Sequence, residues 1–239
     1  MLAGGLGKRL RSVYSRGPKC MAPVGGRLFL EYLLLLLRSA GIREVIMCVG
    51  YKRSQLESWL GNGSRWGVNL TFSVERTLLG TGGALKLAED LITSDCFFVL
   101  NGDSFLDVDL QGMYRHHMAH RALATVAIVS QPRSARYGTV EIAANGKITS
   151  FHEKSSEAQL ANTPAQLING GIYLFQRQFL DLIPRSQVVS LEQEIFPRIV
   201  PAGLCGFVTN SYFIDIGVPQ DFERAQTELP KRFRYDYTS

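Results

Sequence analysis

Cysteine is scarce in this sequence, and the few that it has lie far apart. Four of the 239 residues are cysteines, and no two of them form a Cys-x-x-Cys pair: Cys20, Cys48, Cys96 and Cys205. Nothing in this spacing indicates a disulfide framework. We therefore expect reduced thiols, in a protein of the cytoplasm.

A long hydrophobic run is also missing. The most apolar stretch, LFLEYLLLLL at 28–37, is interrupted by Glu31 and followed by Arg38. A helix that spans a membrane needs about 20 apolar residues. We therefore expect a buried helix at 28–37 and no membrane partner. We expect no secretory signal either, because a glycine-rich loop occupies the start of the chain.

Basic charge is present but not concentrated in one tract. Lys and Arg number 26 against 21 Asp and Glu, and the resulting net charge of +5 is dispersed along the chain. A mildly basic protein suits an anionic ligand. Nucleic acid is not expected as a partner, because the sequence has no recognised nucleic-acid-binding motif.

The pattern of apolar residues in the first half predicts an α/β fold. Runs of strand length at 43–50, 69–74 and 96–103 alternate with helical patterns at 53–61 and 82–91. Strands that are apolar throughout and alternate with helices indicate a parallel sheet with helices on both faces. The chain has no internal repeat and no low-complexity linker.

The second half contains more β structure. Stretches such as LATVAIVS and QLINGGIYLF have the pattern of strands, and Asn145-Gly146 predicts a hairpin turn. Ser190 with Gln193 predicts a capped helix, and Pro219 predicts the start of the last helix. We expect a Rossmann-like α/β fold with a mixed, mainly parallel central sheet, helices on both faces and small β elaborations in the C-terminal half.

The opening stretch MLAGGLGKRLRSVYSRGPKC combines glycines with cations, as phosphate sites do. A Walker A loop would need Gly where Leu2 stands, and Ser or Thr after Lys8, where Arg9 stands. A dinucleotide fingerprint would need a small residue three positions after Gly7, where Leu10 stands. The stretch therefore predicts a phosphate loop of a third kind.

Two aspartates end predicted strands beside that loop. Asp103 closes CFFVLNGD and Asp215 lies in YFIDIG. In open α/β sheets, ligands bind beyond the carboxyl ends of the strands. Paired carboxylates near a phosphate loop predict Mg²⁺, held between the protein and substrate phosphates. The alternative is that Asp103 caps the next segment and Asp215 caps the final helix.

A histidine cluster, MYRHHMAHR, has a weaker claim to function. His116 and His120 are four residues apart and could share a helical face, with His117 beside them. No carboxylate or cysteine accompanies them at the spacing of a metal site. We expect a solvated helix end.

The ordered motifs LAGGLGKRL, PK, LGTGGA, NGD, HEK, NGG and DIG resemble those of the sugar-1-phosphate nucleotidyltransferases. The resemblance covers residues 2–225. Within that family the chain is most similar to the D-glycero-α-D-manno-heptose 1-phosphate guanylyltransferases, through LAGGLG, LGTGGA and NGDSFLDVDL. It implies a place in nucleotide-sugar biosynthesis, of the kind that serves lipopolysaccharide or capsule.

The resemblance implies roles for individual residues around the nucleotide. Arg9 would neutralise the leaving pyrophosphate, Lys19 would contact the α-phosphate, and Asp103 would carry the metal with Asp215. Pro18 fixes the backbone before Lys19. Further nucleotide contacts would come from the opening loop, the LGTGGA turn and the NGD motif: Leu2, Ala3, Gly4, Gly5, Gly7, Lys8, Gly80, Thr81, Asn101 and Gly102.

The same resemblance implies a sugar-phosphate site. Glu153 would accept hydrogen bonds from sugar hydroxyls, and Lys154 would hold the sugar phosphate. A close-approach turn and a strand segment would meet the sugar ring: Tyr137, Gly138, Asn169, Gly170 and Gly171.

The chain departs from the family pattern in two places. Lys8 stands where the family usually has Thr, and a lysine can contact phosphate as a point charge but cannot reproduce a hydroxyl hydrogen bond. Only Met1 and Leu2 precede Ala3, where family members have a longer first strand. We expect either a start further upstream or a weakened edge of the sheet.

The implied reaction needs little acid–base chemistry. A sugar-1-phosphate oxygen attacks the α-phosphorus of a nucleoside triphosphate, and pyrophosphate leaves in line. The phosphate nucleophile is already mostly ionised at neutral pH, because its second pKa is about 6. The protein must position two polyanions and screen their repulsion, which explains the cations and the predicted Mg²⁺.

Glu75 favours GTP as the triphosphate. It matches the family position whose side chain reads the base, and a carboxylate can accept from both guanine N1–H and the N2 amino group. Two alternatives stay open. One is a uridylyl-, thymidylyl- or adenylyltransferase that acts on another hexose 1-phosphate. The other is a non-catalytic nucleotide-sugar-binding regulator.

These features predict one nucleotidyltransferase domain over 1–228. Its part near 1–130 would bind the nucleotide and its part near 131–228 the sugar phosphate. Residues 229–239 have no apolar periodicity and are expected to form a surface tail. The expected partners are GTP and a sugar 1-phosphate, and the sequence leaves a homo-oligomer open.

Overall fold

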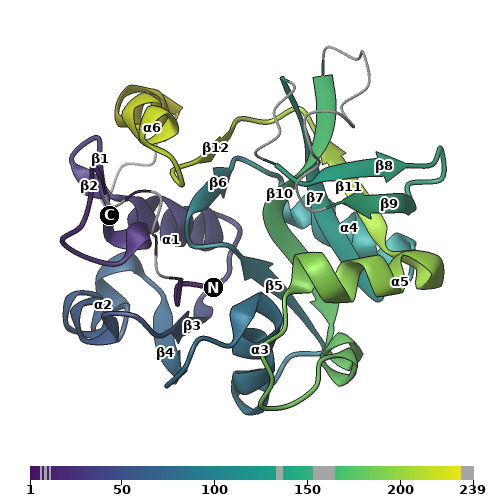
Figure 1. Cartoon of the computed structure of the whole chain (residues 1–239), viewed down its shortest axis with the longest axis horizontal. Coiled ribbons are helices and arrows are strands. Elements are labelled where there is room, and N and C mark those ends of the chain that lie inside the picture. Colours follow the sequence, from purple (N-terminus) through teal and green to yellow (C-terminus); the bar gives the residue numbers. More distant parts are fainter. Residues whose placement is uncertain (6, 8–9, 11, 133–136, 153–164, 233–239) are drawn as a thin grey trace. The chain divides into compact units, whose positions relative to one another are not determined.

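The computed structural model describes residues 1–5, 7, 10, 12–132, 137–152 and 165–232 (Figure 1). The chain forms two compact units. The first unit contains Met1–Leu78, Asn101–Phe105 and Ile214–Ser239, and the second contains Leu79–Leu100 and Leu106–Phe213. This division differs from the expected one near residue 130, because the chain leaves and re-enters the first unit. Which part binds which substrate stays a prediction.

The first unit contains the predicted strand–helix–strand order. Strand β3 (Glu44–Val49) pairs in parallel with β4 (Asn69–Val74), and helix α2 (Arg53–Leu60) connects them. Leu2 forms parallel bridges to both Cys48 and Asn101, so the first strand is a single bridge. The strands predicted at 43–50 and 69–74 and the helix predicted at 53–61 are therefore confirmed.

The leucine-rich stretch is the buried helix α1 (Phe29–Ser39). Apart from Glu31, its residues from Phe29 to Leu37 are buried. The Glu31 carboxylate accepts a hydrogen bond of 3.0 Å from the backbone N–H of Leu28. The one charge in the run therefore satisfies a donor at the start of the helix, and the expectation of a core helix is confirmed.

Helix α6 (Pro219–Arg232) packs on the hairpin of β1 (Pro23–Val24) and β2 (Arg27–Leu28). Gln226 accepts from the Gly25 N–H at 3.1 Å and donates to the Pro23 carbonyl at 2.9 Å. The helix begins at Pro219 as predicted. It continues to Arg232, beyond the expected start of the tail, and residues 233–239 lie outside the described residues.

The second unit is built on a six-stranded sheet with the order β11-β7-β10-β8-β9, to which β5 adds by pairing with β10. Among the described strands of this sheet, only β11 and β7 pair in parallel. The strands are β5 (Cys96–Leu100), β7 (Ala124–Pro132), β8 (Thr139–Ile142), β9 (Ile148–His152), β10 (Ala165–Gln176) and β11 (Cys205–Thr209).

The α/β fold with mixed sheets is confirmed, and the sheet of the second unit is more antiparallel than the apolar runs predicted. The reason is the long strand β10, which pairs antiparallel with β5, β7 and β8. Residues 124–129 of β7 are buried at every position. A strand covered on both faces is apolar throughout whichever way its neighbours run, so composition does not reveal direction.

The described helical segments of the second unit include α3 (Gly80–Leu87), α4 (Leu110–Ala119), a π-helical turn at Leu191–Ile195 and α5 (Phe196–Gly203). Short 3₁₀ segments lie at Glu89–Leu91 and Arg177–Leu182. The predicted cap at Ser190 is confirmed, because its hydroxyl accepts from the Gln193 N–H at 3.1 Å. The reciprocal bond runs from the Ser190 N–H to Glu194 at 2.8 Å instead of to Gln193. Because a π turn contains one more residue than an α turn, the side chain that accepts from Ser190 N–H is that of Glu194 and not that of Gln193.

The expectation of a solvated histidine cluster is wrong for His117. Its side chain is fully buried, with Nδ1 2.8 Å from Thr125 Oγ1 and Nε2 3.1 Å from Gln176 Nε2. Helix α4 contacts β7, β10 and β11, and this packing places His117 in the core. Burial lowers the pKa of His117 to about 4, so its imidazole is neutral at physiological pH.

Two short strands, β6 (Ser104–Leu106) and β12 (Phe213–Asp215), carry the chain from one unit to the other and pair with each other.

Within the described ranges, none of the helices is both long and apolar enough to cross a membrane.

Candidate active site

The side chain of Lys19 lies between two carboxylates of the first unit. Its Nζ is 2.8 Å from Asp103 Oδ2 and 3.2 Å from Asp215 Oδ1. The Lys19 side chain is 10% exposed, that of Asp215 25% and that of Asp103 45%. Three residues predicted for catalysis or metal binding, distant in the sequence, are therefore brought together.

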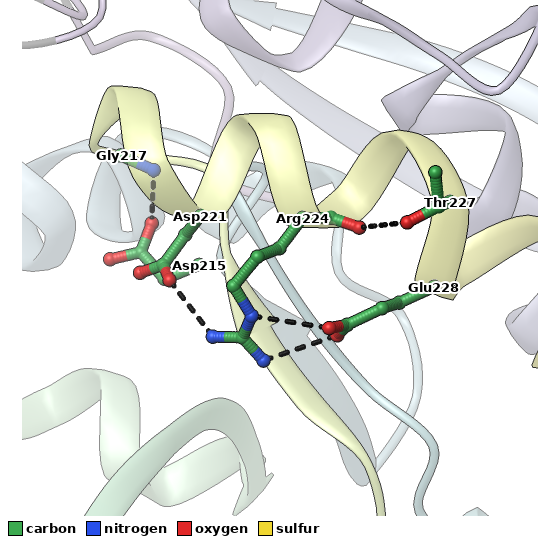
Figure 2. A network of polar contacts seen from close by, with 6 residues as sticks. All are labelled: Asp215, Gly217, Asp221, Arg224, Thr227 and Glu228. Carbon is green, nitrogen blue, oxygen red and sulfur yellow. Dashed lines mark hydrogen bonds and ion pairs between the residues drawn. The ribbon is translucent and has the colours of Figure 1, made fainter.

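Backbone pairing fixes the two aspartates beside each other. The Ile216 N–H donates to the Asp103 carbonyl at 3.0 Å, next to the pairing of β6 with β12. The Gly217 N–H donates to Asp215 Oδ1 at 2.6 Å, in an Asx turn that precedes α6 (Figure 2). The donor, Gly217, comes two residues after the acceptor, Asp215. The carboxylate therefore orders the DIG turn and leaves its other oxygen for a cation.

Gly217 is required by the same geometry. A Cβ at this position would lie 2.7 Å from Lys19 Nζ and 2.8 Å from Asp215 Oδ1. Any side chain there would displace the ammonium or the carboxylate. The DIG motif was recognised in the sequence, but the role of its glycine depends on a contact with Lys19 that the sequence does not show.

Beyond the DIG turn, ion pairs stabilise helix α6 (Figure 2). Arg224 donates to Asp221 at 3.0 Å and to both oxygens of Glu228 at 3.2 and 3.1 Å. Asp221 is buried in the first turn of the helix, where a negative charge is favoured. The helix that follows the Asp215 turn is thus held at its start.

The charges of Lys19, Asp103 and Asp215 shift the pKa values of Lys19 and Asp215. Burial acts to lower the pKa of Lys19, but Asp103 and Asp215 outweigh it and the net pKa is raised. Burial, and then the Asp103 charge, raise the pKa of Asp215, while Lys19 opposes the rise. The lysine therefore stays protonated and lowers the repulsion between the two carboxylates.

The aspartate pair fits a hard divalent cation. Mg²⁺ prefers oxygen ligands, and in phosphate-transfer sites it takes one or two carboxylates together with substrate phosphates and water. Across the residues that the structure describes, no group of three or more His, Cys, Asp and Glu side chains is placed to hold a metal. Asp103 and Asp215 would therefore share the ion with the substrate. Lys19 supplies positive charge between them.

Glu75 lies directly beneath the opening loop. It follows β4, its backbone N–H donates to the Val49 carbonyl at 2.9 Å, and its side chain is buried. A Cβ at Gly4 would overlap Glu75 Oε1, and one at Gly50 would lie 2.8 Å from the same oxygen. Glycines are thus needed at both positions for the carboxylate to sit there. Gly50 was not singled out in the sequence.

The first residues of the loop are fixed by the ends of neighbouring strands. The Ala3 N–H donates to the Cys48 carbonyl at 2.8 Å, and the Gly102 N–H donates to the Leu2 carbonyl at 2.9 Å. A Cβ at Gly102 would lie 2.7 Å from that carbonyl oxygen. These bonds hold the start of the loop against the end of β3 and against the NGD segment, where Asn101 forms a bridge with Leu2.

The loop borders a small, open hollow lined by Gly7, Leu10, Tyr14 and Lys19 among others. Gly7 has a positive φ of 57°, and a Cβ there would lie 3.3 Å from Lys19 Cβ. A non-glycine residue would be strained at this turn. The hollow adjoins the lysine that the two aspartates hold.

The LGTGGA turn lies in the second unit and packs against residues 187–192. The N–H groups of Gly82 and Gly83 both donate to the Val189 carbonyl, at 2.8 and 3.3 Å. A Cβ at Gly80 would lie 2.5 Å from that oxygen, and Gly80 has a positive φ of 73°. The glycines of this motif are therefore explained by close packing. The Thr81 hydroxyl bonds Glu192 at 2.6 Å.

The NGG segment forms an irregularity in β10, where the register with β7 shifts between Asn169 and Tyr173. A Cβ at Gly170 would lie 2.7 Å from Leu106 Cδ2, and Gly171 has a positive φ of 74°. The Asn169 N–H lies 3.4 Å from the Gly138 carbonyl. The ring of Tyr137 meets that of Phe213 edge-on, at 5.6 Å between centroids.

Four predicted site residues lie outside the described residues: Lys8, Arg9, Glu153 and Lys154. The structure also contains site-adjacent residues that were missed in the sequence, namely Gly50, Gly217, Tyr173 and Glu192. Gly217 carried a signal in the DIG motif. Glu192 carried none, because a glutamate in a helical pattern is indistinguishable from a surface residue.

Comparison with known families decides the kind of protein. A family model described as "Nucleotidyl transferase" matches residues 1–232. The chain belongs to the nucleotidyl transferase family. This confirms the resemblance seen in the ordered motifs.

This nucleotidyl transferase is 38% identical over 230 residues to the D-glycero-alpha-D-manno-heptose 1-phosphate guanylyltransferase of Aneurinibacillus thermoaerophilus, with 96% of each chain covered. The Campylobacter jejuni protein of the same name is 35% identical, with 93% of this chain and 95% of that one covered. Mannose-1-phosphate guanylyltransferase of Mycobacterium tuberculosis is 34% identical. That likeness covers 96% of this chain but 63% of the longer relative.

Solved structures show the same likeness for the nucleotidyl transferase. HddC from Yersinia pseudotuberculosis is 30% identical, with a TM-score of 0.83, and 95% of this chain and 97% of that one are covered. HddC in complex with GMP-PN is 29% identical, with a TM-score of 0.81. Relatives named as guanylyltransferases therefore match nearly the full length of this chain.

Proposed function

We propose that this nucleotidyl transferase condenses GTP with a sugar 1-phosphate to give a GDP-sugar and pyrophosphate, with D-glycero-α-D-manno-heptose 1-phosphate as the first candidate sugar. The observation that carries the proposal is the Lys19 ammonium held between Asp103 and Asp215. The relatives named as heptose 1-phosphate guanylyltransferases support the choice of substrates.

The lysine supplies charge where the reaction needs it. In the transferred nucleotide, negative charge on the α-phosphate is redistributed as the sugar-phosphate oxygen attacks and pyrophosphate leaves. A fixed ammonium at this phosphate stabilises that change more than it stabilises the ground state. Lys19 is held by two carboxylates, which favour its protonated form. Arg9 would act on the leaving pyrophosphate.

Asp103 and Asp215 would hold Mg²⁺ in the loaded enzyme. When bound, the ion would screen the repulsion between the phosphates and stabilise charge that develops on them. Lys19 shares the same two carboxylates, so the metal and the lysine compete for their oxygens. The nucleotide phosphates would offer the ammonium a further anionic partner, while Asp103 and Asp215 would hold the ion.

Glu75 would read the guanine base. Its carboxylate is buried and lies close to Gly4 and Gly50. A carboxylate accepts two hydrogen bonds and donates none, which matches the adjacent N1–H and N2–H donors of guanine. Uracil and thymine offer one donor flanked by acceptors, and they match an amide better.

Sugar recognition is proposed on the motif positions alone for Glu153 and Lys154. Tyr137, Gly138, Asn169, Gly170 and Gly171 would line the sugar side from the second unit. The glycines at 170 and 171 leave the β10 irregularity without side chains. We further propose that the protein works in the cytoplasm, where nucleoside triphosphates and sugar phosphates are made.

Pyrophosphate release over a matrix of four triphosphates and several sugar 1-phosphates tests this function. We expect the largest kcat/KM for GTP with the heptose 1-phosphate. Preference for UTP, dTTP or ATP would establish one of the alternative transferases. Binding of a nucleotide-sugar with no turnover in any pair would indicate the non-catalytic regulator.

A further inference from the structure

One buried carboxylate in the second unit accepts hydrogen bonds from three hydroxyl groups. Glu192 is 9% exposed. Its Oε2 is 2.6 Å from the Thr81 hydroxyl and 3.1 Å from the Ser190 hydroxyl, and its Oε1 is 2.9 Å from the Tyr173 hydroxyl. We call these four residues, with Asn169, the Glu192 cluster.

The direction of every bond in the cluster is determined by a second bond. The Thr81 and Ser190 hydroxyls each accept a backbone N–H of the π-helical turn, at 2.8 and 3.1 Å. The Tyr173 hydroxyl accepts the Asn169 amide N–H at 2.9 Å. A hydroxyl has one proton, so each proton is directed to Glu192. Three donors that converge on one side chain match an ionised carboxylate, which only accepts.

The Asn169 amide is oriented by the same chain of bonds. Its Oδ1 accepts the Gly171 N–H at 2.9 Å, so its amino group must face Tyr173. Asn169 and Gly171 belong to the irregular part of β10 that the family motif assigns to the sugar. Two contacts therefore hold this amide, the Gly171 N–H and the Tyr173 oxygen, and the second depends on Glu192 as the acceptor of the Tyr173 proton.

The cluster thus ends at two residues with different expected roles. One branch ends at Thr81, in the turn assigned to the nucleotide, and the other ends at Asn169, on the strand assigned to the sugar. We propose that Glu192 is a positioning residue that sets the geometry of both branches, and so couples recognition of the two substrates within the second unit. This inference rests on the proposed function for the roles of Thr81 and Asn169.

Replacement of the carboxylate by an amide should disturb both branches without changing side-chain volume. In Glu192→Gln, one acceptor oxygen becomes an NH₂ donor. The amide cannot accept from hydroxyls at both ends, so either Thr81 with Ser190 or Tyr173 must turn its proton away. If Tyr173 turns, its oxygen faces two donors and Asn169 loses its fixed orientation.

Steady-state kinetics with each substrate varied tests the proposal, using isosteric variants. Tyr173→Phe cuts the sugar branch, and we expect its KM for the sugar 1-phosphate to rise roughly tenfold with the GTP KM within about twofold. Thr81→Val cuts the nucleotide branch and should raise the GTP KM. Thr227→Val, which removes an exposed hydroxyl of helix α6, is the matched control. Glu192→Gln should raise both KM values.

Non-additivity gives the sharper readout. Adding Tyr173→Phe to Glu192→Gln should change the sugar KM by less than about twofold, because the branch is already uncoupled. A simple packing role predicts the opposite: lower melting temperatures in every variant, with both KM values unchanged. Kinetics of that kind, or a Glu192→Gln enzyme equal to the wild type, would overturn the positioning role and leave the proposed function standing.

A different result would show that the proposed function itself is wrong. If the wild-type protein turns over no pair of triphosphate and sugar 1-phosphate, while Mg²⁺ is present and the protein is folded, the transferase assignment is wrong. The positioning role of Glu192 would then be overturned with it.

Discussion

Lys19 Nζ lies 2.8 Å from Asp103 Oδ2, and the two residues are separated by 84 positions in the sequence. The cation expected at the α-phosphate is thus paired with the carboxylate expected at the metal. Asp215 completes the arrangement at 3.2 Å. We therefore expect that substrate loading would give Lys19 a phosphate partner and would give Asp103 and Asp215 a metal ion.

Asp103→Asn should keep the fold and lower turnover by orders of magnitude. The amide removes one negative charge from the metal site, and charge stabilisation by a bound metal contributes several kcal/mol. Pyrophosphate release and thermal melting, measured on the same preparation, check this. Asp109→Asn, which changes an exposed aspartate in the second unit, is the matched control. Near wild-type turnover in Asp103→Asn, with an unchanged melting temperature, would contradict the metal assignment.

Lys19→Met should lower kcat more than it raises the KM for the triphosphate, because α-phosphate charge changes as the bond breaks. It should also tighten binding of Mn²⁺ to the nucleotide-free protein, since two carboxylates lose a competing cation. Calorimetry with Mn²⁺ measures the second effect without turnover. Lys86→Met, which removes a lysine paired with Glu89 in the second unit, is the control. Weaker Mn²⁺ binding in Lys19→Met would show that the lysine and metal do not share ligands.

Glu75→Gln should reduce the use of GTP. The amide places an NH₂ donor against a guanine donor, which costs about 2–4 kcal/mol for a desolvated group. That corresponds to roughly two to three orders of magnitude in kcat/KM. UTP use should fall less or rise. ITP, which lacks the N2 amino group, should already be a poorer substrate of the wild type. Equal GTP and ITP rates in the wild type, with GTP preference retained in the variant, would exclude Glu75 as the base reader.

The pH dependence of stability should carry a contribution from His117. Its folded pKa of about 4 lies below the ordinary value of 6.5, so the unfolded chain takes up the proton first as the pH falls. The contribution is fully present above pH 6.5 and is lost towards pH 4, at up to about 1.4 kcal/mol per pH unit. Urea unfolding at pH 7 and pH 5 measures it.

His117→Gln should flatten that slope. Equal slopes in the wild type and in His117→Gln would mean that the buried imidazole is not responsible.

Much of the first unit could be predicted from the sequence. Continuous apolar runs predicted β3 and β4, and the leucine-rich run predicted α1. These patterns are local, because burial of one element is visible in its own residues. The strand-end aspartates were also visible, since ligand sites in such sheets follow the strands.

What the sequence could not show depends on contacts between distant segments. The burial of His117 follows from packing of α4 on β7, β10 and β11. The Glu192 cluster joins residues 81, 169, 173, 190 and 192, and no local pattern marks a glutamate that will be buried among hydroxyls. The antiparallel setting of β10 was likewise hidden, because its apolar run suits either direction.

The most direct test of the proposed function is ³¹P NMR of the wild-type protein mixed with GTP, D-glycero-α-D-manno-heptose 1-phosphate and Mg²⁺. We expect the resonances of GTP and the sugar phosphate to be replaced by those of free pyrophosphate and of the diphosphate bridge in a GDP-sugar. This conversion should be lost in Asp103→Asn. Unchanged substrate resonances in a folded wild-type sample that binds both substrates would contradict the proposed guanylyl transfer.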